Sequence, residues 1–185
     1  MTVTEQWQEA QEVLKRTHTL LPSLEAVCAL TIETLKQGKT LFSCGNGGSA
    51  ADALHFAEEF TGRYRSNRKP LPAISLVADT TALTCIANDF GYTDIFSRPL
   101  EALAKPGDLL FAFSTSGNSP NILKAIEIAK KQNVKSILLS GQNGGKARDL
   151  CEHPLLVPSS NTARIQEIHG LFIHMILEAV EQAFS

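Results

Sequence analysis

A pattern of three consecutive segments occurs twice in this chain of 185 residues, and it limits the folds that the chain can adopt. Each copy has a short apolar run, a loop rich in glycine or hydroxyl residues, and a helix-forming segment. The first copy spans residues 40–60 with its loop at 45–48, and the second spans 108–129 with its loop at 114–119. Repeats of strand, short loop and helix are typical of a parallel sheet covered by helices on both faces.

Apolar patterning predicts the remaining elements of this fold. Strands are expected at 72–77, 134–140 and 155–157, and helices at 80–87, 94–104 and 163–184. In parallel sheets of this kind, ligands bind at the carboxyl ends of the strands, where the strand order reverses. The two loops of the repeated pattern both lie at that edge, and Ser49 is expected to cap the helix that follows the first of them.

Two further helices are expected before the first strand. Residues 4–21 have helical apolar spacing, and Pro22 interrupts this pattern. A second helix is expected from Ser23, as its N-cap, to a stop near Gly38. One sheet does not need both helices, so we expect residues 1–38 to pack against another subunit.

Composition and length indicate one cytoplasmic globular domain. The length predicts a single domain over residues 1–185, with an αβα core at 39–185. A net charge of -2 gives no electrostatic case for a nucleic-acid partner. The four cysteines lack the close spacing of a zinc or redox motif, and no signal segment is visible, which indicates reduced thiols in the cytoplasm. No apolar run approaches the roughly 20 residues that cross a bilayer, so no membrane association is expected.

The two loops predict a binding site for a small phosphorylated molecule. Glycines at 45, 47 and 48 allow close approach of the backbone to a ligand, and free N–H groups at a helix N-terminus attract an anion. The second loop adds hydroxyls, although such residues are common in any loop. Neither loop has the spacing of a dinucleotide fingerprint or of a P-loop. The hydroxyl groups concerned are those of Ser114, Thr115, Ser116 and Ser119.

A second group of residues predicts proton transfer. His55 and Glu59 stand four residues apart on one helical face, with Glu58 beside them. The last helix adds Gln166, His169 and His174 among apolar residues. The eight residues from Gln166 to His174 rise roughly 12 Å, so both reach one metal ion only if Gln166 lies at a frayed helix start or the two come from different subunits. The spacing alone leaves both an acid/base site and a metal site open.

Six motifs resemble bacterial phosphoheptose isomerases, which belong to the sugar isomerase (SIS) domain superfamily. The motifs, in order, are Gly45-Asn46-Gly47-Gly48-Ser49, His55-Phe56-Ala57-Glu58-Glu59, Thr61-Gly62-Arg63-Tyr64, Asn88-Asp89-Phe90-Gly91, Ser114-Thr115-Ser116-Gly117-Asn118-Ser119 and Arg164-Ile165-Gln166-Glu167-Ile168-His169. The resemblance implies an α/β fold, a three-layer αβα sandwich with a five-stranded parallel sheet, in a homotetramer whose active sites lie at subunit interfaces. It also implies conversion of D-sedoheptulose 7-phosphate into D-glycero-D-manno-heptose 7-phosphate, the first step towards ADP- or GDP-heptose for lipopolysaccharide or other glycans.

The resemblance also implies roles for individual residues. Glu59 and His174 would move the protons, and Zn²⁺ would be held by His55, Glu59, Gln166 and His174. The substrate-binding residues would be Asn46, Gly47, Gly48, Glu59, Asn88, Asp89, Ser114, Thr115, Ser116, Ser119 and Gln166.

Two other functions compete with this interpretation. An isomerase of another phosphosugar would need the same loops and the same acid/base pair. A non-catalytic relative that binds the replication initiator shares the loops but lacks the glutamate pair and the distal histidine. Glu58, Glu59 and His174 are all present in this chain, which favours the enzyme.

Overall fold

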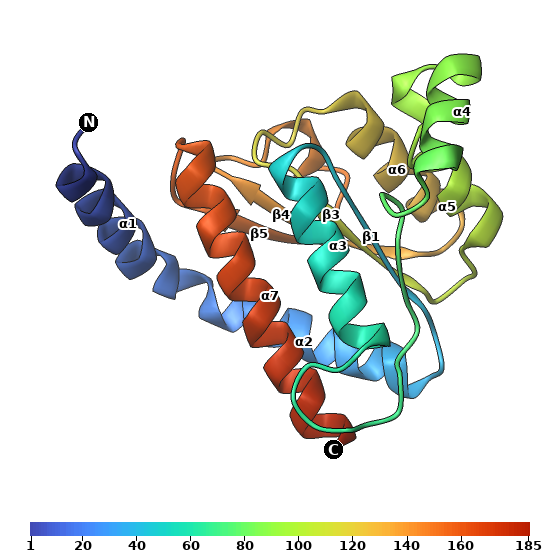
Figure 1. Ribbon diagram of the computed structural model, residues 1–185, viewed down its shortest axis with the longest axis horizontal. Helices are drawn as coiled ribbons and strands as arrows, with labels where there is room; N and C mark the ends of the chain where they lie inside the picture. The colour runs from blue at the N-terminus through green and yellow to red at the C-terminus, as the bar shows by residue number, and fades with distance from the viewer.

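A five-stranded parallel sheet forms the centre of the computed structural model, which describes residues 1–185 (Figure 1). The strands are β1 (Leu41–Gly45), β2 (Ala73–Ser75), β3 (Leu109–Phe113), β4 (Lys135–Gly141) and β5 (His153–Val157). Their order is β2-β1-β3-β4-β5, and every pairing is parallel. The strand order therefore reverses between β1 and β3, whose last residues Gly45 and Phe113 lie side by side. The sheet and its five strands confirm the predicted fold.

Helices cover both faces of this sheet and form the outer layers of an αβα sandwich (Figure 1). One face carries α2 (Leu21–Lys36), α3 (Gly48–Thr61) and α7 (Thr162–Phe184), and the other carries α5 (Ser97–Leu103) and α6 (Pro120–Lys131). The chain also contains α1 (Val3–Thr17), α4 (Thr80–Phe90) and 3₁₀ turns at His18–Leu20, Tyr92–Asp94 and Gly145–Ala147.

The alternating direction of side chains along β3 explains its unbroken apolar sequence. Leu109, Phe111 and Phe113 face the core shared with α3 and α7, whereas Leu110 and Ala112 face the core shared with α6. All five side chains are fully buried. A strand with helices on both sides has no polar face, so it does not alternate in sequence.

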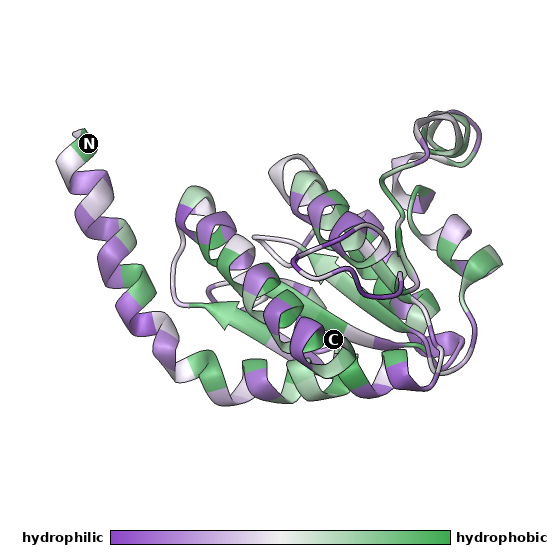
Figure 2. Cartoon of the chain, turned by 60° about the horizontal axis from the view of Figure 1, so that its bottom comes forward, coloured by the Kyte–Doolittle hydropathy of each residue, from purple (hydrophilic) through white to green (hydrophobic).

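Two helices stand away from the sheet. Only Val13 and Thr17 of α1 are buried, and α4 has no buried residue. Figure 2 shows α1 continuing beyond α2 and leaving the body of the molecule, so that its hydrophobic turns are uncovered. Trp7 is 67% exposed on this helix.

The structure corrects three expected helix boundaries. Ser23 is not an N-cap, because α2 begins at Leu21 and accommodates Pro22 in its first turn, where a proline needs no hydrogen-bonded N–H. Ser49 is not a cap either, because Gly47, with φ of 57°, holds the N-cap position of α3 and Ser49 lies inside the helix. The helix expected at 80–87 extends to Phe90, which places Asn88 and Asp89 in its last turn. No helix of the chain combines the length and the apolar character that spanning a membrane requires.

Candidate active site

A polar cavity of about 240 Å³ opens where the strand order reverses. Three helices begin at its wall: α3 after the glycine loop, α6 after the hydroxyl loop, and α7. No lysine or arginine lines it, so its attraction for an anion comes from N–H groups, helix dipoles and hydroxyls. The lining residues are Asn46, Gly48, Ser49, Phe113, Ser114, Thr115, Ser116, Ser119, Thr162 and Gln166. We call this space the hydroxyl cavity.

The four residues with the predicted hydroxyl groups line this cavity. They differ in whether the hydroxyl group already makes a hydrogen bond within the protein. The hydroxyl oxygens of Ser114 and Ser116 accept N–H groups of their own loop, from Gly117 and Asn118, each at 3.2 Å. Ser119 holds the N-cap position of α6, yet its side chain makes no capping bond. Of the first N–H groups of α6, Pro120 has none and that of Ile122 already donates to the side chain of Asn121, so the Ser119 hydroxyl and the Asn121 N–H are the groups available to a ligand.

Gly48 and Gln166 meet at the other wall of the cavity. A Cβ atom at Gly48 would lie 2.5 to 2.9 Å from the side-chain amide of Gln166, which is closer than real contacts allow. The absence of a side chain at position 48 therefore lets Gln166, from the second turn of α7, reach the start of α3. The structure thus brings Gln166 to the predicted phosphate site.

Asn46 lies in the glycine loop after β1 and is held by two partners. Its amide forms a reciprocal pair with Asn121, with N···O distances of 2.9 and 2.8 Å, and the hydroxyl of Tyr92 donates to its Oδ1 at 3.0 Å. Sequence reasoning identified Asn46 but missed Asn121 and Tyr92. No local signal reveals this contact, because 75 residues separate the two asparagines.

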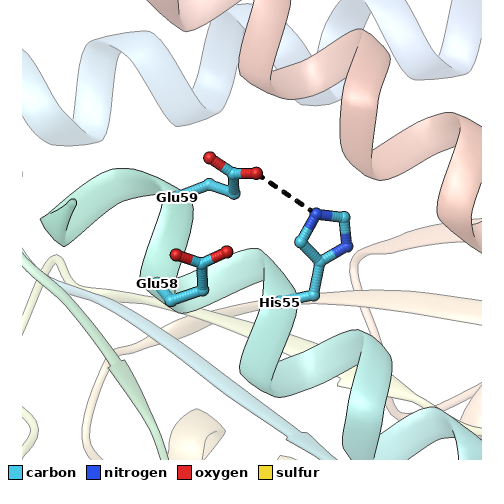
Figure 3. A group of neighbouring side chains, drawn as sticks. All are labelled: His55, Glu58 and Glu59. Carbon is cyan, nitrogen blue, oxygen red and sulfur yellow. Dashed lines mark ion pairs between the residues drawn. The ribbon is translucent and has the colours of Figure 1, made fainter. Parts of the chain in front are cut away.

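The predicted acid/base residues form a cluster further along α3 and α7. Figure 3 shows His55 and Glu59 facing each other across one turn of α3, beside α7; His55 Nε2 lies 3.4 Å from Glu59 Oε1. The ring of His174, from α7, lies 5.1 Å from the His55 ring, measured between centroids. His174 is exposed, so the cluster opens to the surface of the chain.

The cluster has donor atoms suited to a divalent cation. Ligand atoms of His55, Glu58 and Glu59 lie within 4.8 Å of one another. In Figure 3 the carboxylate of Glu58 lies on the neighbouring side of the helix, whereas Glu59 faces the imidazole. Imidazole and carboxylate donors are among the ligands that zinc takes in proteins. With His174 beside them, His55 and Glu59 therefore fit a metal as well as an acid/base pair.

Other predicted residues lie outside both groups. Asn88 and Asp89 are exposed at the end of α4, hydrogen-bonded to each other at 2.8 Å, and neither lines the hydroxyl cavity. His169 is fully buried, with its ring 6.1 Å from that of Phe113, on the face of α7 that packs against the sheet.

Asp52 is an ionisable residue that sequence reasoning missed. It lies on α3 between Gly48 and His55, at spacings of four and three residues that place all three on one helical face. Burial raises the pKa of Asp52 to about 6, and the charge of His55 opposes that rise. Its Oδ2 is buried without a hydrogen-bond partner. The spacing from Gly48 and His55 was the signal that could have identified it.

Comparison with known proteins places this arrangement in a family. Residues 6–141 match the SIS domain family. The phosphoheptose isomerase of Campylobacter concisus is 58% identical over 165 residues, which cover 89% of this chain and 87% of that protein. The chain belongs to the phosphoheptose isomerase family.

Two solved structures of this family have the same fold as the chain. The phosphoheptose isomerase of Neisseria gonorrhoeae is 37% identical with a TM-score of 0.92, over 97% of both chains. A phosphoheptose isomerase from Francisella tularensis is 32% identical with a TM-score of 0.95, over 98% of this chain and 100% of the other. The phosphoheptose isomerase family therefore accounts for nearly the whole length of the chain, including α1 and α7.

Proposed function

We propose that this protein is an aldose-ketose isomerase that converts D-sedoheptulose 7-phosphate into D-glycero-D-manno-heptose 7-phosphate. One observation carries the proposal: α3 and α7 each contribute both to an anion site and to a His/Glu cluster. Gly48 and Gln166 lie at the cavity, while His55 and His174 lie about two turns, and Glu59 about three turns, further along the same two helices. A phosphosugar held at one end would therefore present its other end to the acid/base residues.

The spacing of the two groups supports a long, open-chain substrate. Seven residues of α3 separate Gly48 from His55 and eight residues of α7 separate Gln166 from His174, which corresponds to roughly 10 to 12 Å along either helix. A phosphate bound among Ser114, Ser119 and their neighbours would leave the carbonyl end of an extended heptose phosphate near Glu59. A triose phosphate would fall short.

The reaction requires the carbonyl group to move from C2 to C1. In the proposed route Glu59 removes a proton from C1, the electron pair forms the C1–C2 double bond of an enediol, and the carbonyl oxygen at C2 gains a proton. His174 then supplies a proton at C2 while the hydroxyl proton at C1 leaves, which gives the aldose. Positioned groups of this kind typically accelerate such transfers by about 10² to 10⁴.

We propose Zn²⁺ as the cofactor, held by His55, Glu59 and His174 with a fourth ligand from Gln166. When bound, the metal supplies Lewis-acid polarisation of a carbonyl oxygen. Gln166 lies in the second turn of α7 beside Gly48, so it is not at a frayed helix start. Of the two arrangements that the sequence left open, this favours a Gln166 ligand that comes from a neighbouring subunit.

A homotetramer with active sites at subunit interfaces is part of the proposal. Its support is the uncovered α1, the absence of buried residues in α4, and the open position of His174. A neighbouring subunit over the cluster would exclude water from the reacting carbons and would bring Asn88 and Asp89 to a sugar. The four free cysteines support a reducing, cytoplasmic location for this step towards ADP- or GDP-heptose.

The experiment is a proton NMR assay with sedoheptulose 7-phosphate in D₂O, with and without added zinc and chelator. An aldoheptose phosphate carrying deuterium at C2 supports the enediol route, and metal content is read separately by mass spectrometry. The variant Glu59→Gln should bind the sugar phosphate yet lose most turnover. A folded wild-type protein that binds the sugar but gives no product would instead support the non-catalytic alternative.

A further inference from the structure

We propose that Asn121 and Tyr92 are positioning residues that fix the side-chain amide of Asn46, so that its one free N–H faces substrate oxygen in the hydroxyl cavity. The inference rests on the proposed function, because Asn46 is one of the residues proposed to bind the sugar phosphate. Neither Asn121 nor Tyr92 needs to touch the substrate.

The backbone determines which way both amides are turned. The N–H of Ile122, which is shared with the carbonyl of Ser119, lies 3.0 Å from the side chain of Asn121 and can only donate, so the atom that it meets is the amide oxygen. That oxygen also accepts from Asn46 Nδ2, and Asn121 Nδ2 donates to Asn46 Oδ1. The orientation of Asn46 thus follows from one main-chain donor at the start of α6.

Tyr92 completes the arrangement from the other side. Its hydroxyl donates to Asn46 Oδ1, so this oxygen accepts two hydrogen bonds and both of its lone pairs are used. The side-chain amide of Asn46 therefore has one hydrogen-bonding group left without a partner, the second N–H of Nδ2. Asn46 lines both the hydroxyl cavity and an adjacent, mostly apolar cavity of about 220 Å³ that Tyr92 also lines.

Burial makes this pairing costly to disturb. Asn121 is 1% exposed, and a buried amide without partners is unfavourable by the cost of its lost hydration. The pair also joins the loop that follows β1 to the first turn of α6, across the point where the strand order reverses. If Asn46 turned over, it would present a carbonyl oxygen to the oxygens of a phosphosugar, and like lone pairs repel. The fixed orientation therefore keeps a donor at this wall.

The test is a double-mutant cycle with Asn46→Ala, Asn121→Ala and the combined variant. Values of kcat and KM are measured with sedoheptulose 7-phosphate, and the Kd of the same sugar is measured by calorimetry. Each single variant should lower kcat/KM about ten-fold, mainly through KM, as expected for one lost hydrogen bond to an oxygen of an anionic substrate. The combined variant should lose no more than Asn46→Ala alone, because Asn121 acts through Asn46.

Two further variants separate positioning from folding. Tyr92→Phe removes a hydroxyl from an exposed ring and should raise KM about three-fold without lowering the melting temperature. Gln132→Ala removes an amide at the far end of α6 that bonds only to the carbonyl of Glu101, and it should leave kcat and KM unchanged.

Different results of these experiments would overturn the positioning role alone or the proposed function as well. Additive losses in the cycle, or an unchanged KM in both Asn121→Ala and Tyr92→Phe, would overturn the positioning role while the wild-type enzyme remains active. A wild-type protein that neither binds nor converts the sugar would overturn the proposed function and this inference together.

Discussion

His169 is a buried histidine that the proposed reaction does not use. Neither ring nitrogen has a hydrogen-bond partner, and the ring is shielded from solvent by α7 and the sheet. Burial lowers the pKa of His169 to about 4, and the backbone of Ser140 opposes that shift only in part. The imidazole is therefore neutral in the folded protein, and its protonation favours the unfolded chain.

This neutral histidine predicts a loss of stability in mild acid. Between the unfolded pKa of about 6.5 and the folded pKa of about 4, only the unfolded state takes up the proton, so the free energy of unfolding falls as pH falls through this range. Relative to pH 7.5, the loss at pH 5 should be about 2 kcal/mol. Urea titrations should show that His169→Leu lacks this component, whereas His18→Gln, which changes an exposed histidine, retains it. Equal pH dependence of wild type and His169→Leu would refute the assignment.

The two helices α3 and α7 run in parallel and meet at three levels. Gly48 meets Gln166, His55 meets His174, and the segment after α3 reaches the end of α7 through Ser66, Arg68 and Glu181. The first level belongs to the cavity and the second to the acid/base cluster, whereas the third holds the fold and touches the cluster only through the main chain, where Arg68 donates to the carbonyl of Glu59 at 2.9 Å. Substitutions at the three levels should therefore have different effects.

A methyl group at the first level should impair activity more than stability. In Gly48→Ala the new Cβ would displace the amide of Gln166, a flexible side chain that can move without unfolding the helix. We expect KM to rise about ten-fold, as for one lost polar contact, while the melting temperature changes little. The control is Gly170→Ala, because a Cβ at that position of α7 meets nothing within 4 Å. This control should stabilise the chain by about 0.5 to 1 kcal/mol. Unchanged kinetics in Gly48→Ala would argue against a role of Gln166 at the cavity.

A charge removed at the third level should affect stability more than substrate binding. Burial acts to raise the pKa of Glu181, but hydrogen bonds from Ser66 and the charge of Arg68 outweigh it and hold that pKa below its usual range. The Arg68–Glu181 side chains are 2% and 6% exposed, so Glu181→Ala would leave a buried guanidinium with main-chain carbonyls as its only partners and no opposite charge. We expect a loss of about 3 to 5 kcal/mol in the free energy of unfolding.

The neighbouring ion pair provides the matched control for Glu181→Ala. Glu178 pairs with Arg65 at 2.8 Å, but both side chains are largely or partly exposed. Glu178→Ala should therefore cost less than about 1 kcal/mol in the same urea titration. Similar losses in the two variants would show that burial does not set the strength of the Arg68 pair.

For the molecule as a whole, the uncovered α1 predicts how the subunits associate. Val3, Trp7 and Leu14 are exposed on this helix although they are large and apolar. If they form part of the interface of the proposed tetramer, Trp7→Asp should give smaller species in light scattering after gel filtration and should lower turnover, since the active sites are proposed to lie between subunits. Gln8→Asp adds the same charge one residue along and should remain tetrameric. A tetrameric and fully active Trp7→Asp would remove α1 from the interface.

Much of the fold could be predicted from the sequence because its signals are local. The apolar run of β3 and the amphipathic pattern of α6 indicate a buried strand and a covering helix without any knowledge of distant residues. The capping predictions at Ser23 and Ser49 were wrong because a proline in the first turn and a glycine with positive φ satisfy the same helix starts by other means.

The sequence predicted many of the residues that gather in the cavity and the cluster, but their arrangement only in part. His55 and Glu59 share one helix, so their spacing was sufficient to place them together. The contacts of Gln166 with Gly48 and of Asn46 with Asn121 depend on how strands and helices pack, and no local pattern contains that information. The spacing argument for α7 stated only that Gln166 and His174 reach one metal ion from a frayed helix start or from different subunits.

The placement of the site on both α3 and α7 has a consequence for synthesis of the protein. Translation produces the glycine loop and His55 long before it reaches Gln166 and His174, and at about 5 to 20 residues per second the interval is on the order of ten seconds. A nascent chain that already contains β1, α3 and β3 has neither the second wall of the cavity nor the second histidine. Chains that terminate early, or that lose α7 to proteolysis, should therefore be inert towards sugar phosphates. Translation of α7 therefore determines when activity can begin.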